Sequence, residues 1–282
     1  EALLKSADEA LYAAKHGIGG AIQIYNSEFK EHTRRRRNLE RDLRSALRRD
    51  EFFLVFQPIL SLRDNRISGN EALLRWKHPA LGVSTPTELI NIIEETGLVH
   101  EIGDWVIHEA CKTAASWPKD TRVAVNISPT QLRKAGLLSC VVNALTESRL
   151  PPGCLELEIT ETALVDDSES VLSDLKALRE LGVRIALDDF GTGYSSLTYL
   201  RKLSPSCVKI DGSFVRDMLT NSGCASIIKS VIGLSKDLCI NVVAEGIETA
   251  EQLSFLRNCN CDEGQGYFIS KPKSADELLE SM

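Results

Sequence analysis

The sequence predicts an α/β fold, a (β/α)8 TIM-like barrel with an antiparallel first strand. From Glu51 onward, eight strand-like apolar runs occur, and from the third run on they alternate with helical stretches, as in parallel βα units. The first two runs are joined by a turn so short that it can connect only antiparallel strands. An open doubly wound sheet is the competing fold, but no Gly-x-Gly-x-x-Gly motif follows the first strand to support it.

The spacing of apolar residues predicts each element in chain order. The opening hairpin has strands at Phe52–Leu60 and Ile67–Trp76, with the turn Arg-Asp-Asn at residues 63–65. Short apolar runs predict the later strands at 123–128, 155–160, 183–187, 207–210, 240–244 and 266–269. Helical stretches cover residues 86–96, 99–116, 129–148, 168–181, 195–203, 222–238, 249–258 and 274–282.

Residues 1–25 form a predicted piece of a different domain. Apolar residues recur at helical spacing from Leu3 to Ala14, glycines end this helix, and Ala21–Tyr25 resembles a short strand. One helix and one strand cannot bury a core of their own. We therefore expect this piece to belong to a domain whose body lies outside the sequence.

Residues 26–50 predict a basic linker helix that precedes a barrel domain at 51–282. Arginines are frequent in this segment, acids are interleaved with them, and Leu39, Leu43 and Leu47 form one narrow apolar stripe. We interpret the segment as a solvated helix that packs against a neighbour or a second copy of itself. A nucleic-acid or membrane-surface role is the alternative.

Composition narrows the class of protein. The chain has 282 residues and a formal net charge of −7, which argues against binding a nucleic acid polymer. No signal peptide and no apolar run of about 18 residues is visible, so we expect a cytoplasmic domain. Glu1 is not a natural start, so we expect a fragment whose upstream parts can include a membrane tether. Eight cysteines without a Cys-x-x-Cys pair predict small buried thiols in a reducing compartment.

Polar residues stand where the predicted strands end. In a (β/α)8 barrel the carboxyl ends of the strands form the active-site face. Glu71 lies inside the otherwise apolar second strand, where burial of an unpaired carboxylate would cost much free energy. The residues at or just after later strands are Asn126, Glu158, Glu161, Asp188, Asp189, Lys209, Asp211, Glu245 and Glu248, and Gln265 begins the eighth strand.

This set of residue types favours divalent cations. Carboxylates that converge on one barrel mouth repel each other unless cations lie between them. All the candidate ligands are oxygen donors, which selects Mg²⁺ or Mn²⁺ over zinc. The pair Asp188-Asp189 suggests two ions side by side, an arrangement typical of phosphoester hydrolysis, with Lys209 orienting the nucleophile or neutralising charge. The structural alternative is that these acids are solvated or cap helices and that Lys209 pairs with one of them.

The sequence also resembles the EAL family of cyclic-di-GMP phosphodiesterases. The likeness covers about Phe52 to Pro272 and keeps the family's motif order; one departure is Ile247, where the family often has Val. The matching motifs are Gln57-Pro58, Glu71-Ala72-Leu73-Leu74-Arg75-Trp76, Asn126-Ile127-Ser128, Glu158-Ile159-Thr160-Glu161, Asp188-Asp189-Phe190-Gly191-Thr192-Gly193-Tyr194-Ser195-Ser196-Leu197, Lys209-Ile210-Asp211, Ala244-Glu245-Gly246-Ile247-Glu248-Thr249 and Gln265-Gly266-Tyr267.

The resemblance implies hydrolysis of cyclic di-GMP to linear pGpG with two Mg²⁺ or Mn²⁺ ions. It implies a catalytic group of Lys209, Glu71 and Glu245. The metal ligands it implies are Glu71, Asn126, Glu158, Asp188, Asp189 and Glu245, with Asp188 bridging the two ions. The substrate contacts it implies are Gln57, Leu74, Arg75, Asp211 and Gln265. Glu161 and Glu248 resemble anchors of the loop after Asp189, which in the family is tied to activity and dimerisation.

Further expectations concern partners. Residues 1–25 resemble the closing helix of a GGDEF domain, so we expect GGDEF and sensor domains upstream, and we expect a homodimer through the barrel. A catalytically silent module that senses cyclic di-GMP is the alternative function, and turnover separates the two. A barrel enzyme acting on a carboxylate substrate with bound metals fits the acids but not the motif order.

Overall fold

The computed structural model describes residues 38–80, 82–83, 86–133, 135–164, 169–191 and 196–281. Its contacts divide the chain into two units, one of residues 1–52 with 76–98 and one of residues 53–75 with 99–282. We call these the amino-terminal unit and the barrel unit. The helix and strand predicted within residues 1–25 lie outside the described residues.

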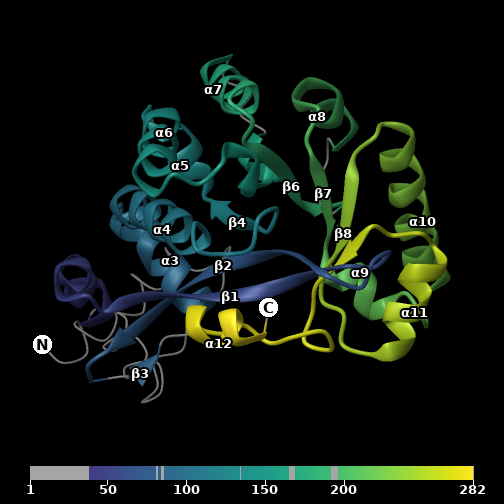
Figure 1. The fold of residues 1–282 in the computed structure, drawn as a ribbon, viewed down its shortest axis with the longest axis horizontal. Coiled ribbons are helices and arrows are strands. Elements are labelled where there is room, and N and C mark those ends of the chain that lie inside the picture. The colour runs from purple at the N-terminus through teal and green to yellow at the C-terminus, as the bar shows by residue number, and fades with distance from the viewer. Residues whose placement is uncertain are drawn as a thin grey trace, which may run out of the picture. The chain divides into compact units, whose positions relative to one another are not determined.

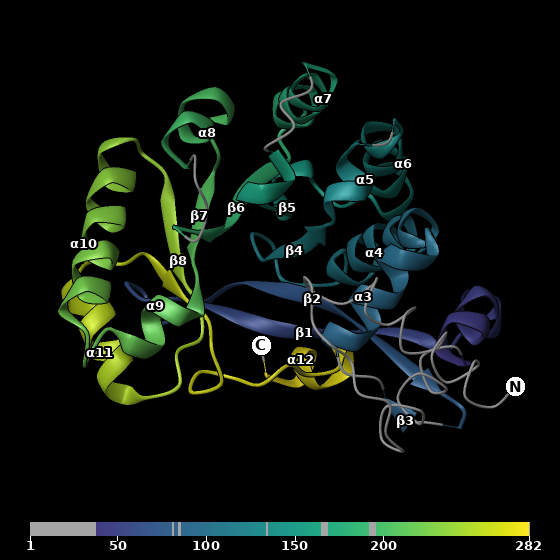
Figure 2. The ribbon, with the colours of Figure 1, turned by 180° about the vertical axis from the view of Figure 1, so that it is seen from behind.

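Eight strands close into a barrel, which confirms the predicted fold (Figures 1 and 2). Their order around the barrel is β1-β9-β8-β7-β6-β5-β4-β2, and β1 also pairs with β2. Strand β1 is antiparallel to β9, whereas the neighbours from β2 through β9 are parallel. The strands are β1 (Phe52–Ser61), β2 (Ile67–His78), β4 (Arg122–Ile127), β5 (Leu155–Thr160), β6 (Arg184–Phe190), β7 (Cys207–Ile210), β8 (Asn241–Ala244) and β9 (Glu263–Gly264).

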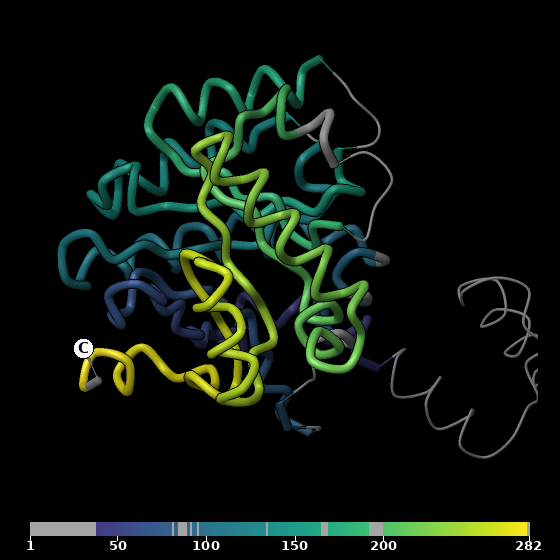
Figure 3. Tube along the Cα trace, turned by 90° about the vertical axis from the view of Figure 1, so that its right-hand side faces the viewer, coloured from purple at the N-terminus to yellow at the C-terminus, as the bar shows by residue number. Residues whose placement is uncertain are grey.

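Helices cover the outer side of these strands, and Figure 3 shows the side covered by α10 and α11. Apolar side chains of strands and helices form one core between the two layers. The helices of the barrel unit are α4 (Val99–Ala114), α5 (Pro129–Arg133), α6 (Leu137–Ser148), α7 (Glu169–Glu180), α8 (Ser196–Leu203), α9 (Gly212–Asp217), α10 (Ser222–Asp237), α11 (Ala250–Asn258) and α12 (Ala275–Ser281). Within the described ranges, no helix has the length and apolar character needed to cross a membrane.

A second, smaller core consists of strand residues alone. Because side chains alternate between the two faces of a strand, every second residue of the barrel strands points inward. The members of this core are small or medium in size: Ile59, Ala124, Ala186, Cys207 and Val243. Two residues further along their strands come candidate site residues such as Asn126, Asp188, Lys209 and Glu245, so the alternation carries these residues to the same interior.

A buried ion network joins strands β4, β5, β6 and β9. The Arg122 guanidinium contacts Glu156 at 3.1 Å and Glu263 at 2.6 Å, and Arg184 contacts the other oxygen of Glu156 at 2.9 Å. Although burial alone would raise the pKa of Glu156, Arg122 and Arg184 hold that pKa below its ordinary value. Breaking one side of such a network leaves a carboxylate buried without its partner.

We therefore expect Arg122→Met to lower the free energy of unfolding by about 3–5 kcal/mol. Urea unfolding followed by circular dichroism measures this change. The matched control is Lys112→Met, which removes a cation from an exposed pair with Glu109 and should leave stability nearly unchanged. Equal midpoints for the two variants would contradict the role of the network.

Two predicted elements differ from the structure. The strand predicted at 266–269 is wrong, because the eighth barrel strand is β9 and Tyr267 and Phe268 are largely exposed beyond it. The strand stops where Gly266 lies so close to the backbone of Ile247 that a Cβ would fall 2.1 Å from its carbonyl oxygen. The helix predicted over 129–148 is divided into α5 and α6, since Gly136 has a positive φ of 124°.

The cysteine prediction is confirmed in part. All eight cysteines are free, and Cys111, Cys140, Cys207 and Cys261 are buried. Cys239, which we expected to be buried, is exposed in a turn with φ of 57°.

The amino-terminal unit contains the end of the predicted linker helix. Residues 38–46 are helical and continue into the 3-10 turn η1 (Leu47–Arg49), and the unit also contains β3 (Gly82–Val83) and α3 (Pro86–Thr96). Leu39 and Leu43 are buried and Leu47 is partly buried, so two of the three residues of the apolar stripe are covered within the chain. Two bonds fasten this segment to the end of β2: Trp76 Nε1 donates to Glu51 at 3.0 Å, and His78 Nε2 lies 3.3 Å from Asp42.

Candidate functional site

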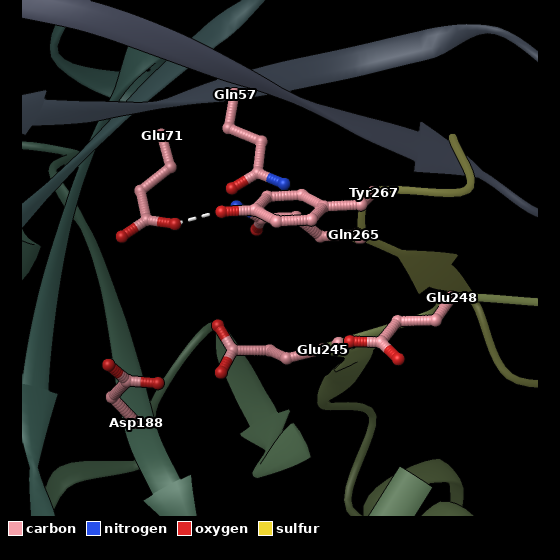
Figure 4. A pocket seen from close by; sticks show the side chains of 9 residues that line it. Gln57, Glu71, Asp188, Glu245, Glu248, Gln265 and Tyr267 are labelled. Atoms are coloured by element: carbon pink, nitrogen blue, oxygen red, sulfur yellow. Dashed lines mark hydrogen bonds between the residues drawn. The ribbon is translucent and has the colours of Figure 1, made fainter. Parts of the chain in front are cut away.

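A cavity of about 420 Å³ opens at the carboxyl ends of the strands in the barrel unit (Figure 4). Glu71 and Gln57 lie on one side of it, and Asp188 and Glu245 lie on the opposite side. The residues that line the cavity are Gln57, Glu71, Asp188, Glu245, Gly246, Glu248, Gln265, Gly266 and Tyr267. Segments far apart in the sequence therefore bring four of the eight predicted acids to the wall of one cavity.

Lys209 lies at the centre of the acids. Its Nζ is 2.8 Å from Glu158, 2.6 Å from Glu245 and 3.5 Å from Asp188, and the side chain is only 1% exposed. Burial alone would lower the pKa of Lys209, but Glu158 and the other carboxylates raise it well above its ordinary value. The ammonium therefore stays charged and offsets part of the negative charge of the mouth.

The geometry of β6 explains how two adjacent acids reach the same place. Successive side chains of a regular strand point to opposite faces. The register of β6 with β7 shifts between Leu187, which pairs with Val208, and Phe190, which pairs with Ile210. Asp189 takes a positive φ of 53° within this irregularity. The bulge thus allows oxygens of both Asp188 and Asp189 to approach Glu245.

Burial makes the carboxylates of the mouth hard to ionise. It raises the pKa of Glu245 to about 8, with Asp188 and Glu71 adding to the rise and Lys209 opposing it. Burial likewise raises the pKa of Glu158 well above its ordinary value. The pKa of Asp189 is raised by burial and by the neighbouring charges of Asp188 and Asp211. Acids with raised pKa values that cluster beside a cavity are a common mark of a functional site.

The residues at the mouth fit a divalent cation. Oxygens of Asp188, Asp189 and Glu245 lie within 4.8 Å of one another, close enough to share an ion. The Oε1 atom of Glu158 is buried and has no hydrogen-bond partner among the described residues. The donors are carboxylate and amide oxygens, which hard ions such as Mg²⁺ and Mn²⁺ prefer.

Amide side chains hold Glu71 on the other side of the cavity. Asn126 Nδ2 donates to Glu71 Oε1 at 2.6 Å, and Gln265 Nε2 donates to Glu71 Oε2 at 2.6 Å. The second of these bonds is drawn in Figure 4. Each oxygen of the buried Glu71 carboxylate thus accepts a hydrogen bond from an amide, which offsets part of the cost of its burial.

The predicted substrate residues lie in varied surroundings. Gln57 lines the cavity and donates to the Ser270 carbonyl at 3.2 Å. Leu74 packs against the core, and Arg75 donates to the Leu74 carbonyl at 2.8 Å. Burial lowers the pKa of Arg75. Asp211 caps helix α9 by accepting from the Ser213 amide at 3.0 Å. At least one of its oxygens therefore has the helix-capping role that was the alternative to a functional one.

The predicted loop anchors face different environments. Glu161 is buried, and neither of its carboxylate oxygens has a hydrogen-bond partner within the described part of the chain. Glu248 lines the cavity. The loop that both residues were expected to hold includes residues 192–195, which lie outside the described residues, so its anchoring stays a prediction.

Tyr267 is a cavity residue to which the sequence reasoning gave no role. It is 61% exposed, and its ring projects toward the cavity from the segment after β9. Its place beside Gln265 in a matching motif was visible in the sequence, but a motif alone does not show which way a side chain points.

The closed barrel and its acidic mouth define a class of α/β barrels able to hold divalent cations at the carboxyl ends of the strands. A model of the EAL domain family matches residues 40–272. The chain belongs to the EAL domain family, as the sequence resemblance indicated.

Three comparisons with known proteins support this assignment. An uncharacterized signaling protein of Caulobacter vibrioides is 45% identical over 99% of this chain and 34% of that protein. The cyclic di-GMP phosphodiesterase NbdA of Pseudomonas aeruginosa is 39% identical over 99% of this chain and 36% of that protein. The solved PaMucR phosphodiesterase in complex with c-di-GMP is 41% identical, has a TM-score of 0.82, and aligns over 86% of this chain and all of that one. The chain spans about a third of the length of these two full-length relatives.

Proposed function

We propose that this chain hydrolyses one phosphodiester bond of cyclic di-GMP and releases linear pGpG, lowering this second messenger in bacterial signalling. The observation that carries the proposal is the Lys209 ammonium enclosed by acids in or directly after three strands, next to a cavity open to a ligand. The names of NbdA and of the PaMucR complex support this choice of substrate.

Two Mg²⁺ or Mn²⁺ ions, when bound, would supply Lewis acidity for an attacking water and for the developing phosphate charge. The ligands of the first ion are proposed to be Glu71, Asn126, Glu158 and Asp188, and those of the second Asp188, Asp189 and Glu245. The acids arrive from separate strands of one closed barrel, so their positions are set by the scaffold.

The other proposed roles belong to the chain's own polar groups. Lys209 orients the attacking water and keeps its proton, because the surrounding carboxylates stabilise the ammonium. Arg75 suits a phosphate, since a guanidinium can donate two parallel hydrogen bonds. Gln57 is proposed to contact the dinucleotide from the cavity wall. Leu74 and Asp211 are proposed to lie near the dinucleotide.

A test incubates the purified chain with cyclic di-GMP and Mn²⁺ or Mg²⁺, repeats the incubation with EDTA, and separates the nucleotides by chromatography. We expect pGpG with either metal and none with the chelator, because the acids alone cannot neutralise a phosphate substrate. Restoring Mn²⁺ in excess should restore the product. Equal product with and without EDTA would contradict a metal-dependent reaction.

The alternative, a sensor that binds cyclic di-GMP without turnover, is favoured by one observation. The bonds of Glu51 to Trp76 and of Asp42 to His78 fasten the segment before the barrel to the strand that also carries Glu71. Such an attachment would suit the transmission of a signal. Tight binding of cyclic di-GMP without pGpG in the same incubation would favour this function over hydrolysis.

We also propose a division into a GGDEF remnant at 1–25, a linker at 26–50 and an EAL domain at 51–282, and a homodimer through the barrel. The chain spans about a third of the length of these relatives, which supports further domains in the whole protein. Light scattering of the purified chain measures its oligomeric state directly.

A further inference from the structure

Glu71 is the acid of the mouth whose two oxygens are both held by side-chain amides. Asn126 holds Oε1 and Gln265 holds Oε2, each at 2.6 Å. We propose that Gln265 is a positioning residue that acts through Glu71, fixing the direction in which this carboxylate offers its free electron pairs to a cation. The inference rests on the proposed function and differs from the substrate contact that the family resemblance implied for Gln265.

The backbone around Gln265 is suited to positioning. Its N–H donates to the Ala244 carbonyl at 2.9 Å, and its carbonyl accepts from the Ile247 N–H at 3.0 Å. The next residue, Gly266, packs against the Ile247 backbone with no room for a Cβ. The side chain itself is 4% exposed. Gln265 therefore approaches Glu71 from a segment fixed on both sides, and it keeps little freedom of its own.

The hydrogen bonds determine the orientation of the Gln265 amide. An amide turned the other way would place its oxygen against a carboxylate oxygen, two acceptors without a proton between them. Nε2 must therefore face Glu71. The amide oxygen Oε1 is buried and has no hydrogen-bond partner among the described residues.

The two amides also restrict what Glu71 can do. Each carboxylate oxygen has about two acceptor directions, and each oxygen of Glu71 already uses one of them on an amide N–H. One direction per oxygen remains for a cation. Removal of the Gln265 amide would free the carboxylate to rotate or to contact Lys209, whose charge already stabilises Glu71's neighbours. Loss of a partner that orients a metal ligand typically weakens metal affinity.

The test measures Mn²⁺ affinity by titration calorimetry for the wild-type chain, Gln265→Met and the control Gln57→Met. Methionine keeps the length of glutamine but donates no hydrogen bond. We expect Gln265→Met to weaken Mn²⁺ binding by about 10–100-fold. The control should leave Mn²⁺ affinity unchanged, because Gln57 donates to a backbone carbonyl and not to a carboxylate. Thermal unfolding in EDTA verifies that each variant is folded, and Gln265→Asn, whose amide is too short to reach Glu71, replaces Gln265→Met if that variant does not fold.

Steady-state kinetics separate positioning from substrate contact. If Gln265 acts through Glu71, high Mn²⁺ restores most of kcat in the variant and KM for cyclic di-GMP stays unchanged. Unchanged Mn²⁺ affinity, or a raised KM at saturating Mn²⁺, would overturn the proposal. Failure of the proposed function is recognised separately, since the wild-type chain would then release no pGpG whatever the Mn²⁺ affinity of the variants.

Discussion

Asp188→Asn is expected to reduce kcat for pGpG formation by roughly 10²–10³-fold, because it removes a charge from the acid proposed to bridge both ions. The substitution keeps the size of the side chain and one oxygen ligand. Asp188 Oδ1 also accepts from the Asp189 N–H at 3.0 Å, a bond that the asparagine oxygen can still accept. The variant should therefore fold, and the substitution should lower turnover and metal affinity.

The measurement for Asp188→Asn is initial rates of pGpG formation at saturating substrate over a range of Mn²⁺ concentrations. Asp237→Asn is the matched control, since Asp237 is an exposed acid at the end of helix α10. This variant should form pGpG at the wild-type rate. Circular dichroism of both variants shows whether the fold is intact. Full activity of a folded Asp188→Asn variant would disprove the assignment of the bridging ligand.

Lys209→Met should lower both turnover and stability, and bound metal should restore only the stability, in part. Turnover should fall by roughly 10²–10³-fold even at saturating Mn²⁺, because the ammonium that we propose orients the attacking water is lost. Without metal, the free energy of unfolding should fall by about 3–5 kcal/mol, since Glu158 and Glu245 lose their buried cation. Mn²⁺ binds the folded form and should recover part of this stability but not the activity.

The stability of Lys209→Met in EDTA should also depend on pH. A carboxyl whose pKa is raised by folding binds more protons in the folded state than in the unfolded state, so stability decreases as pH rises. For Glu245 the window runs from the ordinary value of 4.5 to about 8 in the wild type, and removal of Lys209 extends it upward. Melting temperatures in EDTA at pH 6 and pH 8 measure this dependence. The wild type is the control, and a variant whose melting temperature falls no more than that of the wild type between pH 6 and pH 8 would show that the acids do not depend on Lys209.

Most of the barrel could be predicted because its signals are local. The short turn between β1 and β2 determines an antiparallel pair, and apolar runs ending in polar residues mark the parallel strands. The strand predicted at 266–269 failed because three apolar residues in a row, Tyr267 to Ile269, look like a strand. The strand register with β8 ends at Gly264, and Gly266 beyond it packs closely on Ile247, which belongs to a different segment of the chain, so no local stretch of sequence marks the end of the strand.

The composition of the site could be predicted, but its internal contacts could not. Acids at strand ends are visible as a pattern, whereas the bulge that aims both Asp188 and Asp189 at Glu245 depends on pairing with β7. The amide bonds to Glu71 and the enclosure of Lys209 join residues from different strands. Such contacts depend on closure of the barrel, which no local stretch of sequence records.

The most direct test of the central claim, that acids at the barrel mouth hold the ions of a cyclic-di-GMP phosphodiesterase, is an anomalous difference map of crystals grown with Mn²⁺. The account predicts two peaks at the carboxyl ends of the strands. One should lie among Glu71, Asn126, Glu158 and Asp188, and the other among Asp188, Asp189 and Glu245. Crystals of folded protein with saturating Mn²⁺ and no peak at the mouth would contradict the account.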